Sequence, residues 1–206
     1  DLIKQKLYAR HGERYMEYRE NWARAEALEL QPFPLNLLFD LIDGCNLACP
    51  QCLRSLDIIG DYEGHLNTRS RLSYEDVEAA LDEGYQHGLP SVNIGGSGEG
   101  MLHPDFLKIC QAVMDRDVME YRIATNGLRL NRDTAEALID MQVQMVSVSI
   151  DAFSPETFGK TRGKPHRYQQ VVDNTLALLK LRQERGSIFP LVRVSFVNQP
   201  ANRHEL

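Results

Sequence analysis

The spacing of hydrophobic and polar residues divides most of the chain into alternating strand and helix candidates. Short apolar runs rich in β-branched residues are typical of buried parallel strands. Longer runs with apolar residues three and four positions apart predict amphipathic helices. The predicted strands are residues 35–43, 91–96, 121–125, 143–151 and 191–198. The predicted helices are residues 72–88, 103–116, 131–141 and 167–186.

Residues at the ends of these runs support the assignment. Ser73 and Asp76 suit a capping box, and Gly88 suits the end of the same helix. Pro104 suits the first turn of the next helix, and Gly186 closes the last one. Strands that alternate with helices predict right-handed crossovers and a parallel sheet. The expected fold class is therefore α/β.

The two remaining segments have different patterns. Residues 1 to about 29 predict a helical segment that packs on the domain, and Pro32 and Pro34 end it. The residues expected on its packing side are Leu7, Tyr15, Met16, Tyr18 and Trp22. Residues 53–71 are long, polar and without clear period, which is typical of a functional loop or a disordered segment. We expect either a mobile lid there or an ordered surface loop.

Composition narrows the functional classes. No apolar run is long enough to cross a membrane, and the charged N-terminus lacks the apolar stretch of a signal peptide. The formal net charge of −6 disfavours nucleic acid as a partner. Three of the four cysteines lie within eight residues, which in a chain without an export signal indicates metal binding rather than disulfides. We therefore expect a cytoplasmic location and no membrane partner.

Cys45, Cys49 and Cys52 carry the strongest chemical signal. Thiolates are the usual ligands of iron–sulfur clusters, and three of them leave one iron of a 4Fe–4S cluster without a protein ligand. That iron can accept a small chelating molecule. A structural zinc site needs four ligands, for which His65 or Cys110 would have to serve. Cys110 lies in an apolar helical pattern and is expected in the core instead.

The C-x3-C-x2-C motif after the first predicted strand resembles that of the radical S-adenosylmethionine (radical SAM) superfamily. Further matching motifs end the later strands in order. They are Gly95-Gly96-Ser97-Gly98-Glu99-Gly100, Leu102-His103-Pro104-Asp105-Phe106, Thr125-Asn126-Gly127 and Ser149-Ile150-Asp151. The resemblance extends over roughly residues 35–200, and active sites of parallel barrels gather at this edge. Gly100 departs from the family pattern, which usually has proline there.

The resemblance implies a partial parallel (β/α)6-type TIM-like barrel, with the chain ending after its fifth strand. It divides the chain into a helical segment, 1–34, and a radical SAM core, 35–206, that is incomplete at its C-terminus. The implied cofactors are a 4Fe–4S cluster and S-adenosylmethionine, with flavodoxin or ferredoxin as electron donor. The implied reaction cleaves the cofactor reductively to a 5′-deoxyadenosyl radical. That radical takes hydrogen from a peptide or from a small-molecule substrate such as a sugar.

The resemblance also implies roles for single residues. Cys45, Cys49 and Cys52 would hold the cluster, and Glu99 would accept the ammonium group of the cofactor. Gly96 and Gly98 would let the backbone approach the cofactor, or merely shape a turn. The other expected cofactor contacts are Gln51 near the adenine, Asn126 at the ribose, Ser149 at the methionine or ribose part, and Arg162 at a carboxylate. For Asn126, Ser149 and Arg162 the alternatives are a turn, a buried hydroxyl and a solvated surface arginine.

Other polar residues have open roles. His103 is expected to shape a helix start, and Asp151 either binds a hydroxyl or caps its strand. Arg193 either points into a substrate cavity or extends from an edge strand to solvent. Similar proteins continue into a cysteine-rich domain with auxiliary clusters, which would lie after Leu206. The alternatives to an enzyme are a binding module stabilised by zinc or a cluster, without turnover, and a protein that only carries electrons.

Overall fold

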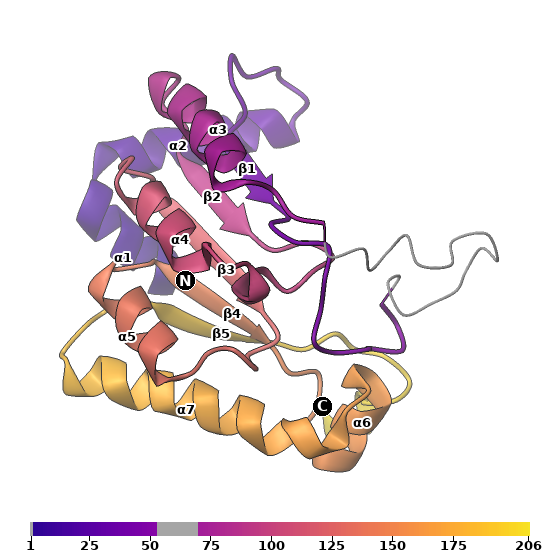
Figure 1. Ribbon diagram of the computed structural model, residues 1–206. Helices are drawn as coiled ribbons and strands as arrows, with labels where there is room; N and C mark the ends of the chain where they lie inside the picture. Colours follow the sequence, from indigo (N-terminus) through magenta and orange to yellow (C-terminus); the bar gives the residue numbers. More distant parts are fainter. Residues whose placement is uncertain (1, 53–69) are drawn as a thin grey trace.

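Five parallel strands form one sheet in the order in which they occur in the chain (Figure 1). The structure is a computed structural model, and it describes residues 2–52 and 70–206. The strands are β1 (Asn36–Phe39), β2 (Ser91–Ile94), β3 (Glu120–Thr125), β4 (Met145–Ser149) and β5 (Leu191–Ser195). The prediction of an α/β fold with a parallel sheet is confirmed. Four strands are shorter than their predicted ranges, because the chain leaves the ladder where the polar motifs begin.

Four helices cover one face of this sheet (Figure 1). They are α3 (Tyr74–Gln86), α4 (Phe106–Met114), α5 (Arg132–Asp140) and α7 (Tyr168–Glu184). The Ser73 hydroxyl accepts a hydrogen bond from the Asp76 amide at 3.1 Å, so the predicted cap of α3 is confirmed. Three short 3₁₀ helices also occur in the described residues, at Gly100–Leu102 (η2), Pro165–Arg167 (η3) and Arg203–Glu205 (η4).

One helix start was predicted wrongly, and one helix was missed. Helix α4 begins at Phe106 with Asp105 as its N-cap, so Pro104 lies outside it rather than in its first turn. Helix α6 (Pro155–Arg162) was not predicted at all. Its start signal is nevertheless present in the sequence: the Ser154 hydroxyl accepts from the Thr157 amide at 3.2 Å, and Pro155 occupies the first turn. The shortness of α6 and its internal Gly159 hide that signal.

The N-terminal segment forms two helices, α1 (Leu2–His11) and α2 (Glu13–Glu26), which meet at Gly12. Leu7, Tyr15 and Tyr18 are buried there, whereas Met16 is 43% exposed, so its predicted place on the packing side was wrong. The buried side chains pack with residues just before or at the starts of strands, namely Leu35, Met119, Phe189 and Leu191. Helices α1 and α2 therefore lie against the N-terminal end of the sheet. The division into units 1–34 and 35–206 stays a prediction.

Alternate residues of each strand face opposite sides of the sheet. One set is fully buried on the three central strands, where it includes Val92, Ile123 and Val146, and it shares a core with Leu81 of α3 and Leu178 of α7. The other set lies on the inner face of the curved sheet. Because the strands are parallel and in register, all their C-terminal ends meet at one edge. The motif residues of the sequence follow these ends.

No helix among residues 2–52 and 70–206 is long and apolar enough to cross a membrane. Of the predicted lid, 53–71, only Ser70 and Arg71 are described. The Asp43 amide donates to the Ser70 carbonyl at 2.7 Å, and Arg71 forms an antiparallel bridge with Ile42. Residues 53–69, including His65, lie outside the described residues, so the lid stays a prediction.

Candidate functional site

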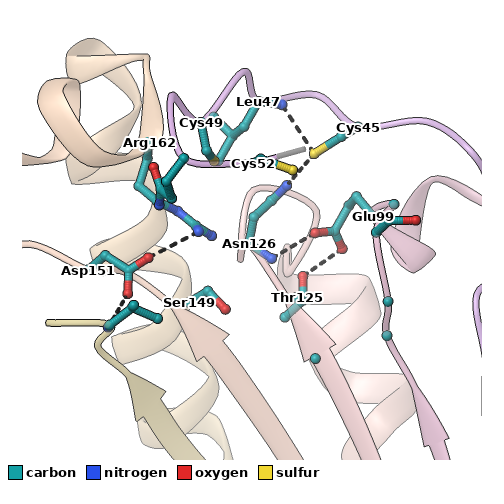
Figure 2. Close-up of a pocket in the computed structure, with 17 residues that line it drawn as sticks. Cys45, Leu47, Cys49, Cys52, Glu99, Thr125, Asn126, Ser149, Asp151 and Arg162 are labelled. Atoms are coloured by element: carbon teal, nitrogen blue, oxygen red, sulfur yellow. Dashed lines mark hydrogen bonds and ion pairs between the residues drawn. The ribbon is translucent and has the colours of Figure 1, made fainter. Parts of the chain in front are cut away.

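A cavity of about 250 Å³ lies at the C-terminal edge of the sheet (Figure 2). Its walls come from the loop after β1, the glycine-rich loop after β2, the ends of β3 and β4, and helix α6. All of the cluster and cofactor residues expected from the sequence line it. They are Cys45, Cys49, Gln51, Cys52, Gly96, Gly98, Glu99, Asn126, Ser149 and Arg162. Their roles as ligands stay predictions, but the fold brings them to one place.

The three clustered cysteines are free thiols, partly buried in the loop that leaves β1. The Cys45 sulfur accepts from the Leu47 amide at 3.5 Å and from Asn126 Nδ2 at 3.7 Å. Burial raises the pKa of the Cys45 and Cys49 thiols above the ordinary value. Nearby hydrogen bonds and the Arg162 charge oppose that rise. The loop therefore presents its sulfurs in a site where a thiolate needs a positive partner.

Cys110 lies away from this loop. Its side chain is fully buried in α4, where its sulfur accepts from the Tyr121 hydroxyl at 3.1 Å. Burial raises the pKa of the Cys110 thiol to about 12. The position in the core agrees with the expectation from its helical pattern, and it rules out Cys110 as a fourth ligand beside the other three cysteines.

Glu99 is a buried carboxylate, 2% exposed, at the start of η2. One carboxylate oxygen accepts from the Thr125 hydroxyl at 2.7 Å, and the other accepts from the Asn126 amide at 2.7 Å. Burial raises the pKa of Glu99, while these hydrogen bonds and the Arg162 charge favour its ionised form. The protein thus holds the carboxylate in one orientation on the cavity wall.

Asp40 holds the glycine-rich loop against the end of β1. Its carboxylate accepts from the Ser97 hydroxyl at 2.6 Å and from the Ser97 and Gly98 amides at 3.0 and 3.3 Å. A Cβ on Gly96, whose φ is +121°, would lie 2.7 Å from the Asp40 carboxyl carbon. A Cβ on Gly98 would overlap the Ile42 carbonyl oxygen. Both positions therefore require glycine for packing within the chain itself, whatever binds in the cavity.

Asn126 uses both ends of its side-chain amide within the protein. Its Oδ1 accepts from the Leu128 amide at 3.0 Å, and its Nδ2 donates to Asn46 Oδ1 at 2.7 Å as well as to the Cys45 sulfur. These contacts favour the turn reading of Asn126, with the added effect that it joins β3 to the cysteine loop. Ser149 ends β4 partly exposed, and Gln51 is exposed in the cysteine loop.

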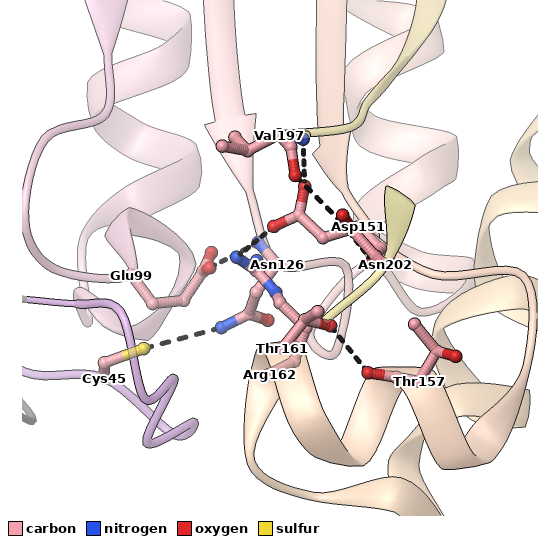
Figure 3. Close-up of polar contacts among 9 residues, drawn as sticks. All are labelled: Cys45, Glu99, Asn126, Asp151, Thr157, Thr161, Arg162, Val197 and Asn202. Atoms are coloured by element: carbon pink, nitrogen blue, oxygen red, sulfur yellow. Dashed lines mark hydrogen bonds and ion pairs between the residues drawn. The ribbon is translucent and has the colours of Figure 1, made fainter. Parts of the chain in front are cut away.

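Arg162 and Asp151 form a largely buried ion pair across the cavity from Glu99 (Figure 3). Arg162 Nη1 lies 3.2 Å from Asp151 Oδ2, and the two side chains are 12% and 2% exposed. The other Asp151 oxygen accepts from the Val197 amide at 2.8 Å. Arg162 is thus not a surface arginine. Its Nε–H is buried and has no hydrogen-bond partner among the described residues.

Three residues with a part in the site went unrecognised in the sequence or were given other roles. Asp40 and Thr125 hold the glycine-rich loop and Glu99, and Asp151 positions Arg162 rather than only capping a strand. Thr125 and Asp151 end predicted apolar strands, and Asp40 interrupts one just where β1 ends; polar residues there are the signal that could have found them. His103 acts as expected at a helix start: its Nδ1 accepts from the Asp105 amide at 3.0 Å.

The site can be compared with known sequences. The family model described as the Radical SAM superfamily matches residues 40–193. A GTP 3′,8-cyclase of Shewanella denitrificans is 31% identical over 153 residues, which cover 74% of this chain and 43% of the cyclase. The AdoMet-dependent heme synthase of Methanosarcina barkeri is 30% identical over 147 residues, 71% of this chain and 40% of the synthase. The chain thus spans about two fifths of the length of these relatives.

Solved structures agree on the fold. SuiB of Streptococcus suis superposes over 94% of this chain and 40% of its own, with a TM-score of 0.63 and 21% identity. The enzyme anSMEcpe, solved with bound AdoMet and the Cp18Cys peptide, superposes over 80% of this chain and 42% of its own, with a TM-score of 0.58 and 17% identity. The family match covers most of the chain and includes the cysteine loop, Glu99, Ser149 and Arg162. The chain therefore belongs to the radical SAM superfamily.

Proposed function

We propose that this chain holds a 4Fe–4S cluster through Cys45, Cys49 and Cys52 and binds S-adenosylmethionine in the adjoining cavity, as the core of a hydrogen-abstracting enzyme. One observation carries the proposal: the three thiols, the Glu99 carboxylate and the Arg162 guanidinium line a single cavity at the sheet edge. A cluster and S-adenosylmethionine are the cofactors of this superfamily, which consists of enzymes. When bound and reduced, the cluster supplies the electron that splits the cofactor into methionine and a 5′-deoxyadenosyl radical.

The donor set fits the cluster better than it fits a single ion. Zinc needs its sulfur ligands at about 2.3 Å from one point. Among the residues that the structure describes, no group of three or more His, Cys, Asp or Glu side chains is arranged to hold such an ion. A 4Fe–4S cluster spreads its thiolates over separate irons. Cys45, Cys49 and Cys52 all line the cavity and supply three of the four thiolates that such a cluster normally takes.

The charged residues fit the ends of the cofactor. Glu99 offers a fixed carboxylate to an ammonium group, and Thr125 and Asn126 keep it in place. The unpartnered Nε–H of Arg162 suits a carboxylate, with Asp151 fixing the side chain from behind. Ser149 and Gln51 also line the cavity, and they would contact the ribose and the adenine. In these assignments the ammonium group of the cofactor faces a carboxylate of the protein, and the carboxylate of the cofactor faces a guanidinium.

The same chemistry suggests a class of substrate, an electron donor and a cellular location. Hydrogen abstraction from a peptide or a small molecule fits the relatives, since one is named for GTP and one neighbour was solved with a peptide. Each turnover that consumes the cofactor needs one electron, for which flavodoxin or ferredoxin is the proposed donor. Free thiols at a cluster site require reducing conditions, which favours the cytoplasm.

Anaerobic reconstitution with iron and sulfide, followed by S-adenosylmethionine and dithionite, tests the proposal. We expect a brown protein with about four irons and four sulfides per chain in this site, and formation of 5′-deoxyadenosine. A binding module without turnover would load metal but form no 5′-deoxyadenosine. In a protein that only carries electrons, the cluster would be reduced and reoxidised reversibly, and S-adenosylmethionine would stay intact. Either result would contradict the proposal.

A further inference from the structure

Two arginines lie on the inner face of the sheet: Arg122 is one step deeper than the cavity, and Arg193 is level with Ala124 at its floor. Ala124 lines the cavity, and Arg122 precedes it by two residues on the same strand, so both share one face. Ser149 also lines the cavity. Ser147 shares its face, and the register pairs Ser147 with Arg193 of β5. Arg122 and Arg193 therefore both belong to the inner face.

Neither guanidinium has a hydrogen-bond or ion-pair partner among residues 2–52 and 70–206. Arg122 is partly buried, and its Nε–H is fully buried with no hydrogen bond. Arg193 is exposed on β5, and neither residue takes part in an ion pair or side-chain hydrogen bond within the described residues. A buried N–H without a partner costs about 1–3 kcal/mol, more for a charged group. Arginine at such a position indicates that something from outside the described residues pairs with it.

The carboxylates on the same face are engaged elsewhere. Asp40, at the upper edge, accepts from Ser97 and Gly98. Glu120, at the lower end of β3, accepts from the Tyr18 hydroxyl at 3.3 Å. Burial and the neighbouring Glu120 charge raise the pKa of Tyr18 to about 12, so it stays a donor. Within the part of the chain that the structure describes, the middle of the inner face thus carries two positive charges without a paired negative one.

The spacing of the two arginines suits one ligand between them. Arg122 and Arg193 lie two strands apart, and Arg193 is two residues further along the strand direction than Arg122. This separates their Cα atoms by about 12 Å. Their long side chains can converge across β4 on one group. Guanidinium forks bind carboxylate and phosphate oxygens in pairs. The small or polar neighbours Ser147 and Asn93 leave room for such a group and offer further hydrogen bonds.

We propose that Arg122 and Arg193 form an oxyanion site that anchors a carboxylate or phosphate group of the substrate. The inference rests on the proposed function and adds the chemical class of its substrate. The anchored group lies at or below the level of Ala124, at the floor of the cofactor cavity, so the rest of the substrate extends toward that cavity. This places a carbon–hydrogen bond of the substrate near the cofactor while the charged end stays remote from the radical.

The test uses the full-length, cluster-loaded protein and four variants: Arg122→Gln, Arg193→Gln, the double variant, and Arg132→Gln as matched control. Arg132 lies on α5, on the other side of the sheet, in an exposed ion pair with Glu136. Calorimetric titration with tripolyphosphate and with citrate measures binding of each anion. We expect each single inner-face variant to weaken binding about tenfold and the double variant to abolish it. Arg132→Gln should bind like the parent protein.

The two anions separate the two sources of the group. Tighter binding of tripolyphosphate assigns a phosphorylated substrate, and tighter binding of citrate assigns a carboxylated one. Arg122→Lys guards against misfolding, because it keeps the charge and should retain part of the affinity. No binding by the parent protein, or an equal loss in Arg132→Gln, would overturn the proposal.

A second readout keeps this proposal separate from the proposed function. Cleavage of S-adenosylmethionine by dithionite without substrate should be the same in Arg122→Gln, Arg193→Gln and the parent protein, because neither arginine lines the cofactor cavity. A parent protein that binds anions but forms no 5′-deoxyadenosine would contradict the proposed function alone. A variant set that cleaves the cofactor but shows no arginine-dependent anion binding would contradict the oxyanion site alone.

Discussion

The two faces of the sheet are built from alternate residues of the same strands, yet they differ in polarity. On the outer face Val92, Tyr121, Ile123, Val146 and Val148 are each fully buried beneath the helices. The inner face carries charged or polar residues in the middle of three strands and an apolar side chain that is 59% exposed on a fourth. These residues are Leu38, Asn93, Arg122 and Arg193.

This difference separates stability from ligand binding. Parallel strands are usually apolar on both sides, because both sides are covered. Here the residues on the outer face form the hydrophobic core. The inner face carries polar groups whose burial in a core would cost free energy. A change on the outer face should therefore act on folding. A change on the inner face or its upper edge should act on ligands, and the following experiments test that separation.

The largest effect is expected at the cysteines. Alanine in place of Cys45, Cys49 or Cys52, one at a time, should remove the cluster and all cleavage of S-adenosylmethionine, because three ligands leave no redundancy. Alanine in place of Cys110, which lies beneath the outer face, should leave the iron content unchanged. Iron and sulfide analysis with 5′-deoxyadenosine assays measures both. Full activity in any single cysteine variant of the loop would show that the ligand assignment is wrong.

A large effect on stability is expected on the outer face. Ile123→Ala removes a fully buried side chain and should lower the free energy of unfolding by about 2–5 kcal/mol. Asn93→Ala, on the inner face of the neighbouring strand, should change it by about 0.5 kcal/mol or less. Urea unfolding of the two variants measures the difference. Equal destabilisation would mean that the inner face is part of the core after all.

An intermediate effect is expected at Glu99. Glutamine keeps its volume but removes the charge, and should weaken binding of S-adenosylmethionine about ten- to hundredfold, the loss of one charged hydrogen bond. Alanine is the poorer test, because it also leaves the Asn126 amide without its partner. Glu156→Gln, exposed on α6, serves as control. Unchanged affinity in a cluster-loaded Glu99→Gln protein would remove Glu99 from the cofactor site.

The smallest effect is expected at Asn126. Its Nδ2 donates to the Cys45 sulfur, and hydrogen bonds to cluster sulfurs favour the reduced, more negative cluster. Asn126→Ala should therefore lower the reduction potential by about 20–60 mV, which corresponds to about 0.5–1.5 kcal/mol for one hydrogen bond. A potential titration followed by electron paramagnetic resonance measures it. A raised or constant potential would mean that the contact does not persist in the loaded protein.

Much of the site could be predicted from the sequence, because its residues follow strands and parallel strands end at one edge. The spacing of Cys45, Cys49 and Cys52 indicated the cluster, and the motifs at Glu99, Asn126 and Ser149 marked the same edge. The partners of these residues were less visible. Asp40 is 57 positions from Ser97, and Thr125 is 26 positions from Glu99. Nothing local in the sequence pairs residues so far apart.

The sequence by itself determined the order of the five strands and of the four helices that cover them, the parallel sheet and the motif residues at its edge, since period and motif spacing act over short distances along the chain. Only the tertiary structure decided what each polar residue does. Arg162 became half of a buried ion pair because α6 places it against Asp151. Arg122 and Arg193 share one face because β3 and β5 flank β4 in register. Such pairings depend on how the strands are arranged in space, and that arrangement follows from packing of the outer face rather than from any local signal.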